Sequence, residues 1–105
     1  MVVEIRAFRG TRRASVYREH VLADGAYDRI VAAAARRGLA LLPSLARGEP
    51  HELDKRSSRR LAGETTDVRM SGELPELDRD LVAIVEVARW CARSPGDAWL
   101  RIQAA

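Results

Sequence analysis

The chain has 105 residues, of which 47% are hydrophobic, and it carries a formal net charge of +3. This length and composition are ordinary for a single globular domain rather than for a disordered or membrane chain. Residues 1–6 contain a glutamate and an arginine and no long apolar run, so we expect no signal peptide or membrane anchor and a cytoplasmic location.

Hydrophobic and polar residues alternate over residues 2–8, with Val3, Ile5 and Ala7 on one side. A period of two predicts a strand with one buried face. A glycine and three arginines interrupt the pattern at residues 9–13, and residues 15–22 then return to a β-favouring composition. The two segments predict a β-hairpin with a basic tip.

The first predicted helix covers residues 24–38. Asp24 is a candidate N-cap, and Gly38 is a typical residue to follow a helix. Between them, spacings of three and four residues place four side chains on one apolar face: Tyr27, Ile30, Val31 and Ala34. Residues 39–42 stay apolar until Pro43, which suits either a short buried strand or a return of the chain to the core.

Residues 43–72 are predicted to be an irregular segment, because prolines, glycines and charged residues are frequent there and apolar residues are few. A structureless loop of this length is uncommon in a small domain. A short helix over residues 53–61 and a short strand over residues 65–70 are therefore both plausible.

The last third of the chain has the strongest pattern. Pro75 suits the start of a helix, and carboxylates at positions 76, 78 and 80 suit its positive end. An apolar stripe follows at helical spacing: Leu77, Leu81, Ile84, Val85, Ala88 and Cys91. Residues 94–97, Ser-Pro-Gly-Asp, then end the helix and turn the chain into a strand over residues 98–103.

This order predicts an α+β domain, in which the N-terminal hairpin and the C-terminal strand form a small, mostly antiparallel sheet with two helices packed on one face. The strands would turn Val3, Ile5, Leu100 and Ile102 toward the helices. Five other side chains would lie on the opposite, open face of the sheet: Glu4, Arg6, Trp99, Arg101 and Gln103.

No catalytic, cofactor or metal motif is recognisable in the sequence, so we expect no enzyme, no bound cofactor and no metal site. Cys91 lies on the apolar stripe and is expected to act as a small buried hydrophobe. His20, in a strand, is expected to be a half-buried partner of a carbonyl or carboxylate, and His51 to be solvated. A small-molecule site built around His20 and Cys91 is the weakest of the alternatives.

The segment at residues 55–60, Lys-Arg-Ser-Ser-Arg-Arg, places four cations around two hydroxyl groups. Such a segment can bind phosphate or be phosphorylated. It is also close to several carboxylates along the chain, and a run of charges is usually a solvated face. We therefore expect a solvated face here.

The two tryptophans lie off the apolar stripes, and exposed tryptophan and arginine are typical of binding hot spots. The leading interpretation is a non-catalytic interaction module that docks its open sheet face onto a protein partner or a second copy of itself. The residues predicted to form this interface are Trp99, Arg101, Arg6 and Trp90.

The alternative is a nucleic-acid-binding domain. Residues 1–22 hold five arginines and two glutamates, which makes the N-terminal part the more basic one. In this interpretation Arg9, Arg12 and Arg13 at the hairpin tip bind phosphates, while Trp99 on the sheet stacks on a base. Seventeen arginines beside one lysine are also what a GC-rich genome produces, so the charge alone does not decide between the two.

Overall fold

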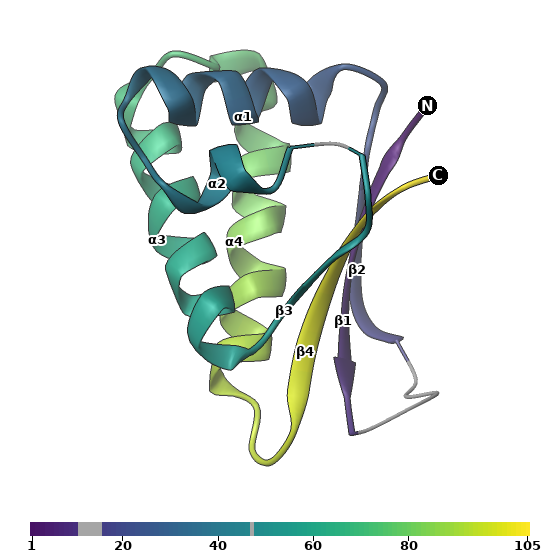
Figure 1. The fold of residues 1–105 in the computed structure, drawn as a ribbon. Helices are drawn as coiled ribbons and strands as arrows, with labels where there is room; N and C mark the ends of the chain where they lie inside the picture. Colours follow the sequence, from purple (N-terminus) through teal and green to yellow (C-terminus); the bar gives the residue numbers. More distant parts are fainter. Residues whose placement is uncertain (11–15, 47) are drawn as a thin grey trace.

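The structure is a computed structural model that describes residues 1–10, 16–46 and 48–105. Within these residues an antiparallel sheet is covered by helices, so the predicted α+β fold is confirmed (Figure 1). The strands are β1 (Val3–Arg9), β2 (Val16–Leu22), β3 (His51–Leu53) and β4 (Ala98–Ala104). The helices are α1 (Ala26–Arg36), α2 (Leu41–Ser44), α3 (Lys55–Ser71), the 3-10 turn η1 (Pro75–Leu77) and α4 (Asp78–Arg93).

The four strands have the order β2-β1-β4-β3, and every neighbouring pair is antiparallel. Ile5 of β1 lies opposite His20 of β2 and Ile102 of β4. Buried and partly exposed residues alternate along β1 and β4, as a strand with one buried face requires. The predicted hairpin and C-terminal strand are both present. Residues 11–15 of the hairpin tip, including Arg12 and Arg13, lie outside the described residues.

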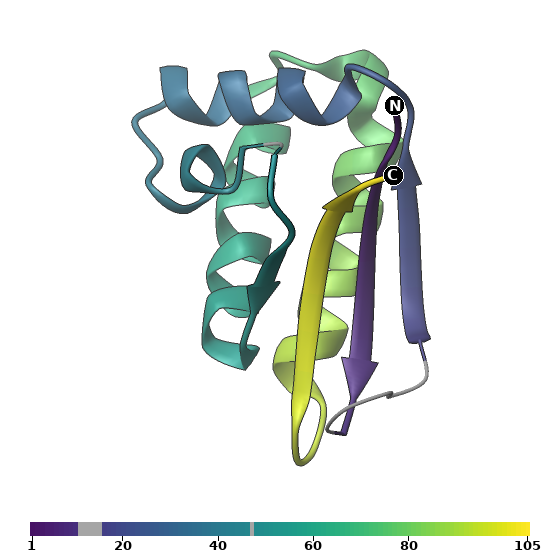
Figure 2. The ribbon, with the colours of Figure 1, turned by 45° about the vertical axis from the view of Figure 1, so that its right-hand side comes forward.

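All the described helices lie on one side of the sheet, which leaves its other face uncovered by any described element (Figure 2). Helix α4 packs against β1, β2 and β4, and α3 packs along α4. The fully buried side chains of both layers form one core, which includes Ile5, Leu100, Ile84 and Leu61. Residues such as Glu4 and Arg6 lie on the opposite face because strand side chains alternate.

Helix α1 ends as the sequence predicts but starts differently. Gly38 has a left-handed φ of 72°, its N–H donates to the Ala35 carbonyl, and the N–H of Leu39 donates to Ala34. This pair of hydrogen bonds is the Schellman arrangement, which glycine favours after a helix. The prediction that Asp24 is the N-cap is wrong, because the cap position is Gly25 and no side chain caps the helix.

The prediction of an irregular segment at residues 43–72 is wrong for most of its length. The segment contains the end of α2, the short edge strand β3, and the seventeen residues of α3. Asp54 caps α3 by accepting a hydrogen bond from the Ser57 amide at 2.7 Å. The strand considered for residues 65–70 is absent, since these residues belong to α3.

Helix α3 escapes a search for apolar periodicity because small polar residues occupy part of its buried face. Ser58 and Thr65 are both fully buried, and they alternate along that face with Leu61 and Val68. Their spacings of three and four residues are helical. The buried face therefore has the right period but too few hydrophobic side chains to be recognised.

Helix α4 confirms the strongest sequence pattern. Its buried residues include Leu81, Ile84, Ala88 and Cys91 of the predicted stripe, and the turn at residues 94–97 follows it. The first predicted turn of the helix is the separate 3-10 turn η1, which has Pro75 at its start. None of the described helices combines the length and the apolar character needed to cross a membrane.

Candidate functional site

The structure separates the residues of the predicted interface into two groups. Arg6 and Arg101 are cross-strand neighbours on the open face of the sheet, and Trp99 lies on the same face. Trp90 belongs to α4, on the helix-covered side. The four residues therefore do not form one patch, because the sheet lies between Trp90 and the other three.

On the open face, the Trp99 side chain is engaged within the domain. Its ring stacks on Phe8, the residue directly opposite it in the sheet, with ring centroids 4.2 Å apart and planes inclined by 15°. The indole Nε1 donates a hydrogen bond of 3.2 Å to the carbonyl of Gly10. Trp99 therefore helps to hold the end of β1 against β4.

The charged residues of the open face neutralise one another in part. Arg6 forms ion pairs with Glu4 at 2.6 Å and with Glu19 on β2 at 3.1 Å. Arg101 lies between Arg6 and Glu52 in the sheet register, and its Nε is shielded from solvent with no hydrogen-bond partner among the described residues. The net charge with which this face could attract a binding partner is therefore small.

We expect Trp99→Ala to lower the free energy of unfolding by about 1–3 kcal/mol, because it removes an aromatic stack and a hydrogen bond. Urea denaturation followed by circular dichroism measures the change. Val21→Ala is the control, because Val21 is 45% exposed on β2 and its truncation should change stability by less than about 0.5 kcal/mol. Unchanged stability of Trp99→Ala would instead leave this ring available as the interface anchor predicted from the sequence.

On the other side of the sheet, Trp90 is partly buried against Tyr17 of β2. The two rings are stacked, with centroids 5.4 Å apart and planes inclined by 18°. The register of β1 and β2 shifts here, since Ala7 pairs with Arg18 while Phe8 pairs with Val16. Tyr17 is thus the extra residue of an irregularity in the ladder, which directs its ring toward α4.

Two arginines lie against this aromatic pair. The guanidinium carbon of Arg9 is 5.3 Å from the centre of the Tyr17 ring and 5.6 Å from that of Trp90. The guanidinium carbon of Arg18 is 5.6 Å from the centre of the Trp90 ring. These distances suit cation–π contacts. Arg9 therefore lies with Trp90, on the side of the sheet opposite Trp99, so the predicted combination of Arg9 with Trp99 is not formed.

A hollow with a volume of ≈ 620 Å³ opens beside the aromatic pair. We call it the Trp90 hollow. Its lining comes from the end of β1, the start of β2 and the last turns of α4: Arg9, Arg18, Glu86, Arg89, Trp90, Arg93, Ser94 and Pro95. Four arginines and one carboxylate thus surround an aromatic floor. Sequence reasoning missed Tyr17, Arg18, Arg89 and Arg93.

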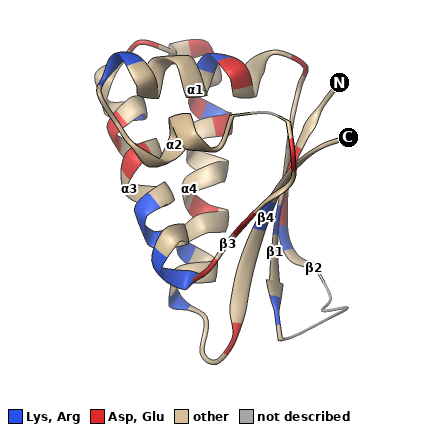
Figure 3. Cartoon of the chain, in the orientation of Figure 1, with Lys and Arg blue, Asp and Glu red and all other residues tan. Residues whose placement is uncertain are grey.

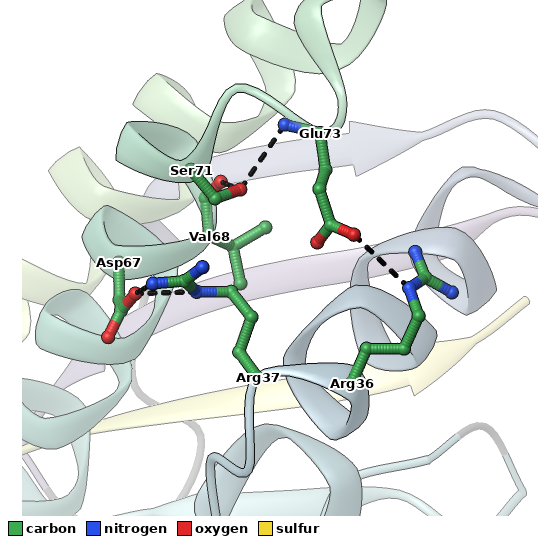
Figure 4. Close-up of polar contacts among 6 residues, drawn as sticks. All are labelled: Arg36, Arg37, Asp67, Val68, Ser71 and Glu73. Carbon is green, nitrogen blue, oxygen red and sulfur yellow. Dashed lines mark hydrogen bonds and ion pairs between the residues drawn. The ribbon is translucent and has the colours of Figure 1, made fainter.

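The arginines at the α1 end of the molecule are arranged quite differently. Arg36 pairs with Glu73 at 3.2 Å, and Arg37 hydrogen-bonds to Asp67 at 2.7 Å (Figure 4). Arg29 pairs with Glu76 in the same region. Arginine and carboxylate alternate there, so the charge is balanced locally.

At the opposite end, where β1 and α4 end and α3 begins, basic residues gather on neighbouring elements (Figure 3). Six arginines at this end form no ion pair with any described carboxylate. We call them the arginine end: Arg9, Arg18, Arg56, Arg59, Arg89 and Arg93. Arg79 and Arg101 also lack such a pair but lie elsewhere. Among the described residues, most of the arginines that lack a carboxylate partner are thus concentrated at this end.

The basic segment at residues 55–60 forms the first turns of α3 and contributes Arg56 and Arg59 to the arginine end. Ser58 is fully buried, and its hydroxyl donates a hydrogen bond of 3.3 Å to the sulfur of Cys91. A buried hydroxyl is closed to phosphorylation while the domain is folded. The two serines therefore do not act as an exposed pair.

His20 and Cys91 are placed as the sequence predicts, and they lie in separate surroundings. The His20 Nε2 is 2.7 Å from a carboxylate oxygen of Asp80, which connects β2 to α4. Cys91 is fully buried. Burial raises the pKa of the Cys91 thiol, and the hydrogen bond from Ser58 opposes this rise in part.

This raised pKa predicts a loss of stability at alkaline pH. Below the ordinary thiol pKa of about 8.5, folded and unfolded chains both hold the proton. Above it, the unfolded chain loses the proton first, so the stabilising contribution declines as pH rises toward the folded-state pKa. Urea denaturation between pH 7 and 10 tests this, and Cys91→Ala should flatten the decline. An identical slope in both proteins would contradict the prediction.

No group of three histidine, cysteine, aspartate or glutamate side chains within the described ranges is arranged to hold a metal ion. Comparison of the chain with protein-family models, with curated proteins and with solved structures finds no match.

Proposed function

We propose that this protein is a non-catalytic nucleic-acid-binding module that holds phosphates at the arginine end and stacks a base in the Trp90 hollow. The observation that carries the proposal is the contrast between the two ends of the molecule. At the α1 end, Arg29, Arg36 and Arg37 each have a carboxylate partner, whereas the six residues of the arginine end have none.

Guanidinium groups without a carboxylate partner suit phosphate well. Each presents a planar fork of N–H donors that matches two phosphate oxygens, and binding displaces counterions from the nucleic acid. Contacts with Trp90 and Tyr17 already restrict the conformations of the Arg9 and Arg18 side chains. These side chains therefore lose less conformational entropy when a ligand binds.

The aromatic pair favours nucleic acid over an acidic protein. Tyr17 is 45% exposed while its ring stacks on Trp90, so part of its surface is available to a ligand. Proteins that bind single strands without sequence preference combine a basic groove with aromatic rings on which bases stack. An acidic peptide would use the arginines but would leave this aromatic surface unused.

The test is a titration with a single-stranded oligothymidylate, following tryptophan emission and the anisotropy of a labelled strand, at low and at physiological salt. We expect saturable quenching and an affinity that falls with salt, by a log–log slope of about −0.7 for each phosphate contact. Trp90→Phe should remove the quenching while retaining part of the binding. Absence of binding at both salt concentrations would reject the proposal. It would also be rejected if polyglutamate displaced the labelled strand as effectively as unlabelled oligothymidylate does.

Glu86 provides an independent test, because it is the one carboxylate among the described residues that line the Trp90 hollow. We expect Glu86→Gln to raise the affinity for the oligothymidylate several-fold, since it removes repulsion of a phosphate at close range. The matched control is Glu73→Gln, which makes the same change at the α1 end. An equal effect of the two substitutions would place the bound strand away from the Trp90 hollow.

The docking of the open sheet face onto a second copy of the chain remains a second candidate. It is favoured by Val16 and Val21 of β2, which are each 45% exposed, and Val16 lies opposite Phe8 of the stacked pair. Light scattering over a range of protein concentrations measures the oligomeric state. A dimer that Val21→Asp dissociates would support this candidate, whereas a monomer at every concentration would reject it.

A further inference from the structure

A second hollow lies between α3 and α4, directly beside the Trp90 hollow. We call it the α3–α4 groove, and its volume is ≈ 320 Å³. Its lining consists of three arginines and three small residues: Arg59, Ala62, Gly63, Arg89, Ala92 and Arg93. No carboxylate belongs to this described lining, so the groove is suited to an anion.

The two hollows share a wall. Arg89 and Arg93 line both of them. They are four residues apart on α4, so they project from the same side of the helix, one turn from each other. A ligand can therefore extend along these two side chains from the Trp90 hollow into the α3–α4 groove. Along this path it stays close to a guanidinium group.

The groove has room for a ligand because its floor is made of small residues. A Cβ atom added at Gly63 would meet no atom within 4 Å, so the space above this position is open. Arg59 reaches the groove from α3, while Arg89 and Arg93 reach it from α4. Three guanidinium groups on two helices thus surround a site large enough for a phosphate group.

We propose that the nucleic acid bound by this protein is a single strand that crosses α4. One base stacks at Tyr17 and Trp90, and a phosphate further along the strand lies in the α3–α4 groove among Arg59, Arg89 and Arg93. This inference rests on the proposed function and adds to it the class of nucleic acid and its path.

A single strand suits this path better than a duplex. Stacking on an aromatic side chain needs a base that is free of its own stack, which a single strand supplies at little cost. A flexible backbone can also bend from one hollow into the other across the last turns of α4. A duplex would have to open before it could use the Trp90 hollow.

The experiment compares Gly63→Glu, Gly63→Ala and Met70→Glu. Each replaces a residue of α3 with a good helix former, and the open space at Gly63 allows the fold to persist, which circular dichroism checks. Met70 is 75% exposed and lies two turns from Gly63, so Met70→Glu makes the same charge change outside the groove.

The probes are labelled oligothymidylates of two, four, eight and twelve nucleotides and a duplex of the longest length. We expect affinity to rise with length and the single strand to bind more tightly than the duplex. Gly63→Glu should weaken binding of the longer strands about ten-fold more than Met70→Glu does, while the dinucleotide is little affected. Gly63→Ala should bind as the unaltered chain does.

Equal affinities of Gly63→Glu and Met70→Glu would overturn the inference, as would a preference for the duplex. Either result would leave the proposed function standing, because the unaltered chain would still bind nucleic acid. Failure of the unaltered chain to bind any of these probes would reject the proposed function and the inference together.

Discussion

Replacing both Arg89 and Arg93 with glutamine is expected to weaken binding of single-stranded DNA by about 100-fold. Each substitution removes a charge-assisted hydrogen bond to phosphate, worth about 1.5 kcal/mol or more, and about 1.4 kcal/mol corresponds to a factor of ten in affinity. The effect is expected to be the largest of any pair of arginines, because these two line both the Trp90 hollow and the α3–α4 groove.

The salt dependence of the same variant gives a second measurement. Loss of two phosphate contacts should make the slope of log affinity against log salt shallower by about 1.4 on a single strand. A loss of affinity with an unchanged slope would mean that the two arginines act on the structure rather than on phosphate. Anisotropy titrations at four or more salt concentrations provide the slope.

The matched control is the double variant Arg29→Gln and Arg36→Gln, which removes the same formal charge from the α1 end. Both of these arginines are paired with carboxylates, Glu76 and Glu73. Removing them frees two negative charges far from the arginine end, so binding should weaken only a few-fold through the overall field. Equal losses in the two double variants would contradict a localised site and favour a general attraction by net charge.

The second large effect concerns stability. Glu64→Ala is expected to lower the free energy of unfolding by about 2–4 kcal/mol, because two backbone amides lose their acceptor. The Glu64 carboxylate accepts hydrogen bonds from the amides of Leu41 at 2.9 Å and Leu42 at 2.8 Å. The N-cap residue of α2 makes no side-chain hydrogen bond to the helix, so this carboxylate from α3 caps the N-terminus of α2 instead.

The expected loss is large because the site is shielded from water. The Glu64 side chain is only 10% exposed, and the Arg60 guanidinium lies 3.7 Å from its carboxylate. Because water has little access to this site, it cannot fully replace the hydrogen bonds that the two backbone amides lose. Glu64→Gln keeps one carbonyl acceptor and should be less destabilised than Glu64→Ala.

Urea denaturation measures these differences, with thermal midpoints falling on the order of 10 °C for Glu64→Ala. Glu73→Ala is the control, since Glu73 is an exposed carboxylate whose surface ion pair with Arg36 should contribute at most about 1 kcal/mol. A Glu64→Ala protein as stable as Glu73→Ala would show that α2 does not need this cap.

The parts of the fold that the sequence predicts are those in which local patterns and tertiary burial agree. Strands β1 and β4 are recognisable because their side chains alternate between a buried and an open face. Helix α4 is recognisable because its stripe is strongly apolar and a Ser-Pro-Gly-Asp turn ends it. In these elements the buried positions are occupied by hydrophobic residues, so hydrophobicity along the sequence indicates which positions are buried.

The sequence suggests only a short helix over residues 53–61, and most of helix α3 was missed because several of its buried residues are polar. Ser58, Thr65 and Glu64 are buried although they are polar. Two of them owe their place to another element, since Ser58 donates to Cys91 on α4 and Glu64 caps α2. The signals that do mark this helix are Asp54 at its start and Gly72 after its end. Capping residues predict a helix here more reliably than hydrophobicity does.

The candidate site was only partly predictable for a related reason. The sequence alone determined three of the four strands, the helix α4 that covers them, and the open face on which Trp99 lies, because these follow from local periods of two and 3.6 residues. An irregularity at Tyr17 and the pairing of arginines with carboxylates were decided by the tertiary structure. Side chains from β1, β2, α3 and α4 come together only after the chain has folded. The spacing of residues along the sequence therefore does not indicate which arginines will form ion pairs with carboxylates.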